Sequence, residues 1–251
     1  MKINHVKGYC QVGETCGIYA FINAMIDFRK CERESVNCFA EKLWEKAIDS
    51  NYKGNFKDMS PDILNYSLIG EFASSQNLVD FLNKNKDFIN KELSVLSDRK
   101  FNKAKIINND EVDNLSTGTY LIVIRTQCEV CHCICYKKYI DKGVIINSAN
   151  SPRSQEKRAM RLATCKKKTI KSSDDLRILI YNAQNIFKVN LKPTKRFCLC
   201  SKLFNKLKDK KYLKGWPDEA RRNFCKIRNL SDCCYSYKKY NKQPFLPIKI
   251  F

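Results

Sequence analysis

Residues 119–149, "TYLIVIRTQCEVCHCICYKKYIDKGVIINSA", decide the fold of this chain. The parts at 119–126 and 143–149 are rich in β-branched and aliphatic residues, and the part at 131–139 alternates along its length. Both patterns are typical of β-strands. The connections between the three parts are too short for a crossover helix, so neighbouring strands must run antiparallel. This stretch therefore predicts a three-stranded antiparallel meander.

The residues that precede the meander carry helical patterns instead. Apolar side chains recur at steps of three and four over 16–29, "CGIYAFINAMIDFR", which predicts a helix with one apolar stripe. Further helices are expected at 37–50, where Asn37 is a suitable N-cap, at 60–64, which opens with "SP", and over 74–93 from a serine cap. Helices first and strands second predict an α+β fold.

The charge of the chain is strongly asymmetric. Of the formal net charge of +21, residues 1–150 carry +1 (20 Lys and Arg against 19 Asp and Glu), and residues 151–251 carry +20 (27 against 7). We expect a core at 1–165 and a basic C-terminal region at 166–251, which can belong to the same domain. Such a basic region favours an anionic partner, such as nucleic acid, a phospholipid surface or an acidic protein. A solvated, lysine-rich surface without a partner is the other interpretation.

The sequence contains 14 cysteines and no segment typical of export or membrane insertion. No apolar run approaches the roughly 20 residues that span a bilayer, and the N-terminus lacks the apolar stretch of a signal peptide. We therefore expect a cytoplasmic protein, or one exported by a signal-independent route, with mostly reduced thiols. A structural zinc site stays open as an alternative, because Cys128 and Cys131 have ligand spacing and Cys198 with Cys200 could complete four thiolates.

Histidine limits the possible catalytic chemistry, because the chain has only His5 and His132. His5 precedes every expected element, whereas His132 lies on an expected strand, which would fix its ring. Its neighbours Cys133 and Cys135 would point to the opposite face and serve packing. Asn147, on the next strand, could accept the Nδ1–H of the imidazole and hold its tautomer.

Cys16 is the expected nucleophile, because it opens the helix at 16–29. The positive end of the helix dipole stabilises a thiolate, and an adjacent imidazolium would stabilise it further. Gly17 would leave room for a substrate carbonyl. The Gln11 side-chain amide and the Cys16 backbone N–H could form an oxyanion hole.

The order Gln11, Cys16-Gly17, His132 and Asn147-Ser148 resembles that of papain-like cysteine peptidases. The resemblance covers about residues 1–152. It implies a papain-like fold, in which an N-terminal helical half carries the nucleophile and an antiparallel sheet carries the histidine and the asparagine.

These observations predict a thiol-dependent hydrolase or acyl transferase with a Cys16–His132–Asn147 triad. Peptide or isopeptide cleavage is the default reaction, and glutamine deamidation or transamidation would use the same residues. The expected ligand is a protein or peptide substrate, and the chemistry needs no cofactor and no metal. The alternative is a non-enzymatic protein that binds nucleic acid or an acidic partner, with an inactive or zinc-stapled core.

Overall fold

The computed structural model of the chain describes residues 2–12, 15–48, 70, 72, 74–108, 111, 115–125, 131–148, 197–198, 217–218, 221–222, 234–235 and 246–251. In this part of the chain the helices are α1 (Cys16–Met25), α2 (Arg33–Ala47), α3 (Ser75–Lys84) and α4 (Lys86–Leu93). The strands are β1 (Lys2–Val6), β2 (Ala104–Ile106), β3 (Gly118–Arg125), β4 (Cys131–Lys138), β5 (Lys142–Ile146), β6 (Phe197–Cys198), β7 (Cys234–Tyr235) and β8 (Ile248–Ile250).

Six of these strands form one sheet in the order β1-β5-β4-β3-β8-β2, and β6 pairs with β7 separately. The meander β3-β4-β5 is antiparallel, as predicted, and β8 and β2 extend it in antiparallel pairing. Only β1 is parallel to its neighbour β5. The expected α+β class is confirmed for the described residues.

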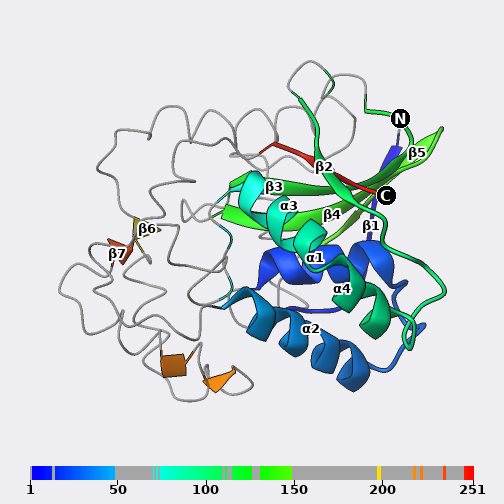
Figure 1. Cartoon of the computed structure of the whole chain (residues 1–251). Coiled ribbons are helices and arrows are strands. Elements are labelled where there is room, and N and C mark those ends of the chain that lie inside the picture. The colour runs from blue at the N-terminus through cyan, green and yellow to red at the C-terminus, as the bar shows by residue number, and fades with distance from the viewer. Residues whose placement is uncertain are drawn as a thin grey trace.

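Helix α1 lies at the centre of the molecule. It packs against β4 and β3 on one side and against α2 on the other, and Figure 1 shows it between the sheet and α2. Every residue from Gly17 to Met25 is buried. Burying a side chain such as Phe21 or Ile22 contributes about 1.5–3 kcal/mol, so this apolar helix contributes substantially to the core.

The boundaries of α1 and α2 correct two details of the sequence analysis. Helix α1 ends at Met25 rather than at residue 29, because Ile26 is extended and Arg29 has a positive φ of 71°. Helix α2 begins at Arg33, so Asn37 is not a cap. It lies inside the helix, where its Oδ1 accepts a hydrogen bond of 2.8 Å from the Tyr19 hydroxyl.

The expected serine cap is confirmed, because the Ser74 side chain accepts a hydrogen bond from the Asn77 N–H. The expected helix over 74–93 is divided in two at Asn85. At this position the Asn85 side-chain amide donates a hydrogen bond to the Phe81 carbonyl, and the chain does not continue as one helix. The helix expected at 60–64 lies outside the described residues.

Strands β1, β2 and β8 were not predicted. His5 therefore does not precede every element: its backbone pairs with that of Ile145 on β5. Strand β8 lies between β3 and β2, so residues 246–251 belong to the same sheet as the meander. The expected boundary at 165/166 falls outside the described residues.

Asparagine side chains connect distant segments of the core by one repeated arrangement. In each case the side-chain amide forms two hydrogen bonds with one residue of another segment: its oxygen accepts from the backbone N–H, and its nitrogen donates to the backbone C=O. The backbone groups of that residue are thereby paired, as they would be by a neighbouring strand. The pairs are Asn23 with Tyr9, Asn83 with Ala104, and Asn90 with Phe101.

The two faces of the sheet carry alternating residues of the same strands. Cys133 and Cys135 face the helices and belong to the main core, as predicted. Ile134 and Tyr136 are also buried but lie on the other face with His132. Among the described residues, no helix is long and apolar enough to cross a membrane.

Candidate active site

Cys16 is the first residue of α1, and the local structure leaves the positive end of this helix without a side-chain cap. The Thr15 hydroxyl donates to the Val12 carbonyl at 2.5 Å instead of accepting from a helix N–H. The first turn carries no acidic residue. The partial positive charge of the helix N-terminus therefore acts on the Cys16 thiol without an opposing carboxylate in that turn.

His132 and Asn147 form the pair that the sequence predicted. They lie on the same face of neighbouring strands, and the His132 Nε2 and Asn147 Oδ1 atoms are 2.8 Å apart. The bond uses Nε2, not Nδ1 as expected. An amide oxygen only accepts, so Nε2 must be the protonated nitrogen, and in the neutral ring Nδ1 is the basic nitrogen.

The environment of His132 favours this neutral ring. Burial lowers the pKa of the imidazole below its ordinary value, and the bond to Asn147 opposes this shift in part. At neutral pH His132 is therefore an uncharged base in one fixed tautomer. The expected imidazolium is not the resting form in this environment.

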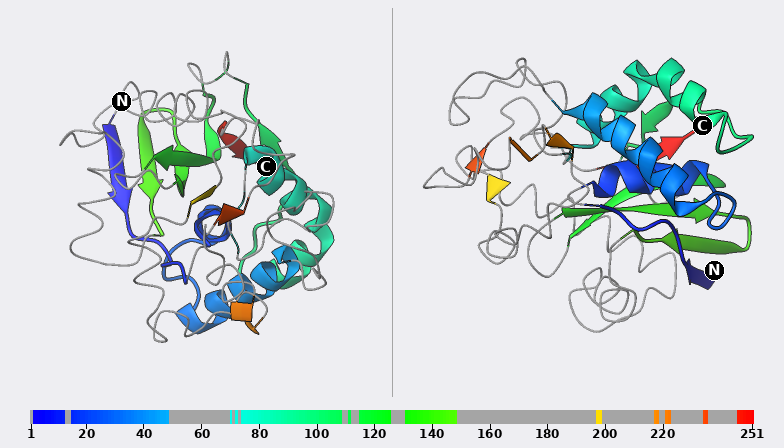
Figure 2. Two further views of the ribbon diagram at one scale, coloured as in Figure 1. Left: turned by 90° about the vertical axis from the view of Figure 1, so that its left-hand side faces the viewer. Right: turned by 90° about the horizontal axis from the view of Figure 1, so that it is seen from below.

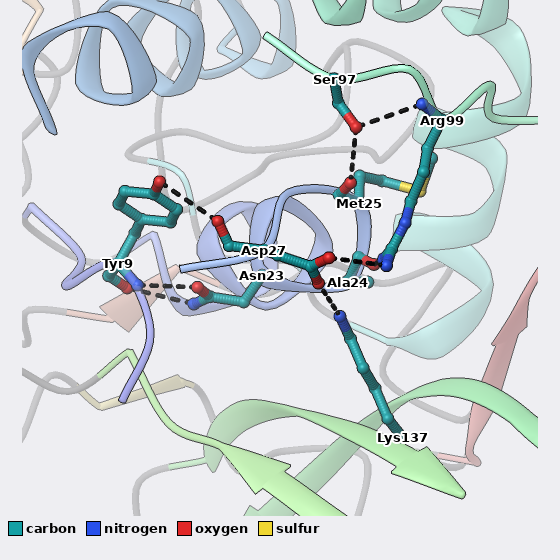
Figure 3. A network of polar contacts seen from close by, with 8 residues as sticks. All are labelled: Tyr9, Asn23, Ala24, Met25, Asp27, Ser97, Arg99 and Lys137. Carbon is teal, nitrogen blue, oxygen red and sulfur yellow. Dashed lines mark hydrogen bonds and ion pairs between the residues drawn. The ribbon is translucent and has the colours of Figure 1, made fainter. Parts of the chain in front are cut away.

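The packing of α1 on β4 brings Cys16 beside the residue that follows His132. Burial raises the pKa of the Cys133 thiol well above its ordinary value, and the nearby Cys16 thiol raises it further. At the other end, Asp27 bonds to Lys137 at 3.0 Å (Figure 3). From Cys16 to Met25 the helix rises about 14 Å, and from Cys133 to Lys137 the strand rises about 13 Å. The two elements therefore run side by side in the same direction. The start of α1 therefore lies against the end of β4 that contains His132, but on the face of Cys133. The His132 side chain is on the opposite face, and no described contact joins it to Cys16.

Gln11 is held next to Asn147 by two hydrogen bonds to Ser148. Its backbone N–H donates to the Ser148 carbonyl at 2.7 Å, and its Oε1 accepts from the Ser148 hydroxyl at 3.0 Å. Ser148 is buried. Because the amide oxygen is bound to Ser148, the amide nitrogen is the end directed away from Ser148.

A second contact fixes the segment that carries Gln11. Two residues earlier, the Tyr9 N–H donates to Asn23 Oδ1 at 2.7 Å, and Asn23 Nδ2 donates to the Tyr9 carbonyl at 3.1 Å (Figure 3). The Tyr9 hydroxyl also donates to the Cys31 carbonyl at 2.9 Å. The segment between β1 and α1 is thus attached to the same helix that carries Cys16.

Arg99 and Asp27 fix the far end of that helix. The Arg99 guanidinium donates to the Ala24 carbonyl at 3.1 Å and pairs with Asp27 at 2.9 Å (Figure 3). Asp27 therefore links α1 to both Arg99 and Lys137. Hydrogen bonding and the positive charge of Lys137, with Arg99, hold the pKa of the Asp27 carboxyl below its ordinary value despite partial burial.

The surroundings of Gly17 correct the role expected for it. A Cβ at Gly17 would lie 3.0 Å from the Phe72 ring, so the space beside this glycine is occupied by an aromatic side chain. Gly70 also lies close, with a positive φ of 110°, and a Cβ there would lie 3.0 Å from the Thr15 side chain and 2.5 Å from Trp44 Nε1. Gly17 therefore permits packing at the start of α1.

Several expectations fall on residues outside the described part. Cys128 and Cys200 lie there, so the expected four-thiolate zinc site is not tested. Within the described ranges, no group of three or more metal-ligating side chains is present. Most of the basic region at 166–251, expected to bind nucleic acid or an acidic protein, is likewise outside them.

The described contacts thus join His132 to Asn147, Gln11 to Ser148, and Cys16 to the strand of His132. The sequence analysis quoted Ser148 without giving it a role, and it missed Asn23, whose signal was a polar residue inside an otherwise apolar helix. In comparisons with known proteins, no family model, no curated protein and no solved structure matches this chain.

Proposed function

We propose that this protein is a thiol-dependent hydrolase or acyl transferase, with cleavage of peptide or isopeptide bonds as its default reaction. The observation that carries the proposal is the 2.8 Å bond between His132 and Asn147, at the end of β4 that lies against the start of α1. This bond leaves a basic Nδ1 on a partly buried ring. A nucleophilic thiol needs such a base beside it. Because Cys133 faces α1 and His132 lies on the other face of β4, the proposal requires the His132 ring to reach Cys16 around the start of the strand.

In the proposed mechanism, His132 Nδ1 takes the proton of the Cys16 thiol, and the thiolate attacks the substrate carbonyl. The Gln11 amide and the Cys16 backbone N–H stabilise the oxyanion that forms. His132 then gives its proton to the leaving amine, and water attacks the acyl-enzyme with His132 again acting as base. Asn147 keeps the imidazole in one tautomer throughout.

The fold of the catalytic part is proposed to be papain-like. Two features support this assignment: the nucleophile opens a buried helix that packs on β4, the strand of the base, and the orienting amide directly follows β5, the antiparallel neighbour of β4. Glutamine deamidation and transamidation need the same residues and differ in the substrate and in the group that resolves the acyl-enzyme.

A peptide mixture prepared from a whole proteome tests the proposal. New peptide termini, deamidated glutamines and new isopeptide bonds are mapped by mass spectrometry after incubation with the protein. We expect one class of product, its loss in Cys16→Ser, and its retention in Cys38→Ser, which changes an exposed thiol on α2. Product that forms equally well with Cys16→Ser would overturn the proposal and favour a binding protein.

A further inference from the structure

Four lysines and one aromatic ring gather on the sheet, on the face turned away from α1. They are Lys103, Lys105, Lys138, Lys249 and Phe251, which we call the lysine face. It lies on β2, β8 and the end of β4, across the sheet from β1 (Figure 2, left). Along β4, Lys138 is about 20 Å from His132, so this surface is separate from the candidate active site.

The orientation of these side chains follows from the core residues beside them. Ile248 and Ile250 are buried against the helices, so Lys249 between them points to the opposite face. Lys105 is its direct cross-strand neighbour and is exposed. The two strands thus present their lysines on one side.

Contacts among the side chains show that the group is one surface. The Lys103 and Lys249 ammonium groups lie 5.4 Å and 5.1 Å from the centre of the Phe251 ring, which is 42% exposed. Lys249 also donates to the Ser116 hydroxyl at 2.6 Å, and Lys138 donates to the Leu115 carbonyl.

The positive charge of this surface is not neutralised within the described residues. None of the four lysines forms an ion pair with a described carboxylate; the ion pairs there involve other side chains. Strands β2, β3, β4 and β8 contain no aspartate or glutamate. Like charges directly opposite each other on neighbouring strands, as at Lys105 and Lys249, destabilise a sheet. A bound polyanion would remove this repulsion.

We propose that the lysine face binds single-stranded nucleic acid. The ammonium groups would contact successive phosphates, and the exposed part of the Phe251 ring would provide a stacking surface for a base. Positive charge beside an exposed aromatic ring on a sheet is the combination that single-strand binding uses. The proposal concerns binding and is independent of the proposed thiol chemistry.

Two other anionic partners fit the surface less well. An acidic peptide would use the charges but has no planar group that requires Phe251. A phospholipid surface would require several apolar side chains to insert, and Phe251 is the one exposed large apolar residue of the lysine face. The aromatic ring therefore distinguishes nucleic acid from both.

Fluorescence anisotropy of the full chain with a labelled 12-nucleotide poly-uridine, between 50 and 300 mM KCl, tests the proposal. We expect the double variant Lys103→Glu/Lys105→Glu to reduce the slope of log K against log[salt] by about 1.4, since each phosphate contact to a single strand contributes about 0.7. Phe251→Ala should weaken binding by at least about fivefold and leave the salt slope unchanged.

The matched control is Lys84→Glu/Lys91→Glu, which makes the same change of charge at exposed positions on α3 and α4. It should weaken binding much less than the variant of the lysine face. An equal effect of the two double variants would overturn the proposal, as would unchanged binding in Phe251→Ala. Equal binding of poly-glutamate or of phosphatidylserine vesicles, abolished by the same variants, would assign the surface to a protein or a membrane instead. Circular dichroism checks that each variant is folded.

Discussion

Replacing Asn23 by alanine is expected to destabilise the protein strongly, because two backbone groups of Tyr9 lose their partners. Asn23 is 1% exposed, and its side chain bonds to the Tyr9 N–H at 2.7 Å and to the Tyr9 carbonyl at 3.1 Å. A buried polar group left without a partner costs about 1–3 kcal/mol. Two such groups give a decrease of about 2–6 kcal/mol in the free energy of unfolding, measured by urea denaturation.

Asn23→Asp provides a sharper form of the same prediction. At pH 7 the carboxylate accepts from the Tyr9 N–H but repels the Tyr9 carbonyl, and burial raises its pKa in the folded state. The introduced carboxyl then has a higher pKa in the folded state than in the unfolded state. Its protonation stabilises the folded protein at low pH, and this stabilisation is lost as pH rises through the folded-state pKa. The protonated acid donates and accepts as asparagine does. The deficit relative to wild type should therefore shrink between pH 7 and pH 4.5.

Asn102→Ala is the matched control, because the Asn102 side chain is exposed. It should change the free energy of unfolding by less than about 0.5 kcal/mol. If Asn23→Ala is no more destabilising than Asn102→Ala, the two bonds from Asn23 to Tyr9 do not stabilise the fold, and the prediction is refuted.

Three further predictions concern the sheet and the site. The fold lowers the pKa of His132, so as pH falls the unfolded chain takes up a proton before the folded chain does. The free energy of unfolding, measured by urea titration, should therefore decrease below about pH 6.5. His132→Gln should make this decrease smaller. Gly143→Ala places a Cβ 2.7 Å from the buried Tyr136 ring, so unfolding should require about 1–3 kcal/mol less; an unchanged melting temperature would contradict this. Ser148→Ala should lower kcat by up to about tenfold through the freed Gln11 amide, and Gln11→Ala by about 10²–10³, measured on a peptide from the proteome mixture; equal losses would show that Ser148 does more than position Gln11.

Local patterns predicted those parts of the fold that local forces decide. The meander could be found because alternating and β-branched residues at 119–149 leave no other regular structure, and the Ser74 cap because its hydroxyl has a short-range partner. Strand β8 could not be found in this way. Three residues, "IKI", have no distinctive pattern, and their pairing with β3 depends on a contact between segments more than 100 positions apart.

The site shows the same division. Residue chemistry and order were enough to single out His132 and Asn147, which the structure joins. The nitrogen that forms the bond depends on ring orientation, and the neutral state of the ring depends on burial, and neither is written in the local sequence. The bonds of Gln11 to Ser148 required the packing of β1 beside β5, because this pairing brings residues 11 and 148 together.

The rate at which Cys16 is alkylated at pH 6, compared between wild type and His132→Ala, tests the proposed thiol–imidazole pair most directly. Dilute iodoacetamide is used, the labelled positions are mapped by mass spectrometry, and the exposed thiol of Cys38 is the internal reference. A neutral His132 accelerates alkylation by accepting the Cys16 proton as the sulfur attacks the reagent, an effect of the size of general-base catalysis, at least about tenfold. We predict that Cys16 reacts about tenfold faster than Cys38 and loses this advantage in His132→Ala. Equal rates for the two thiols in wild type, or an advantage of Cys16 that is undiminished in His132→Ala, would contradict the proposed pair.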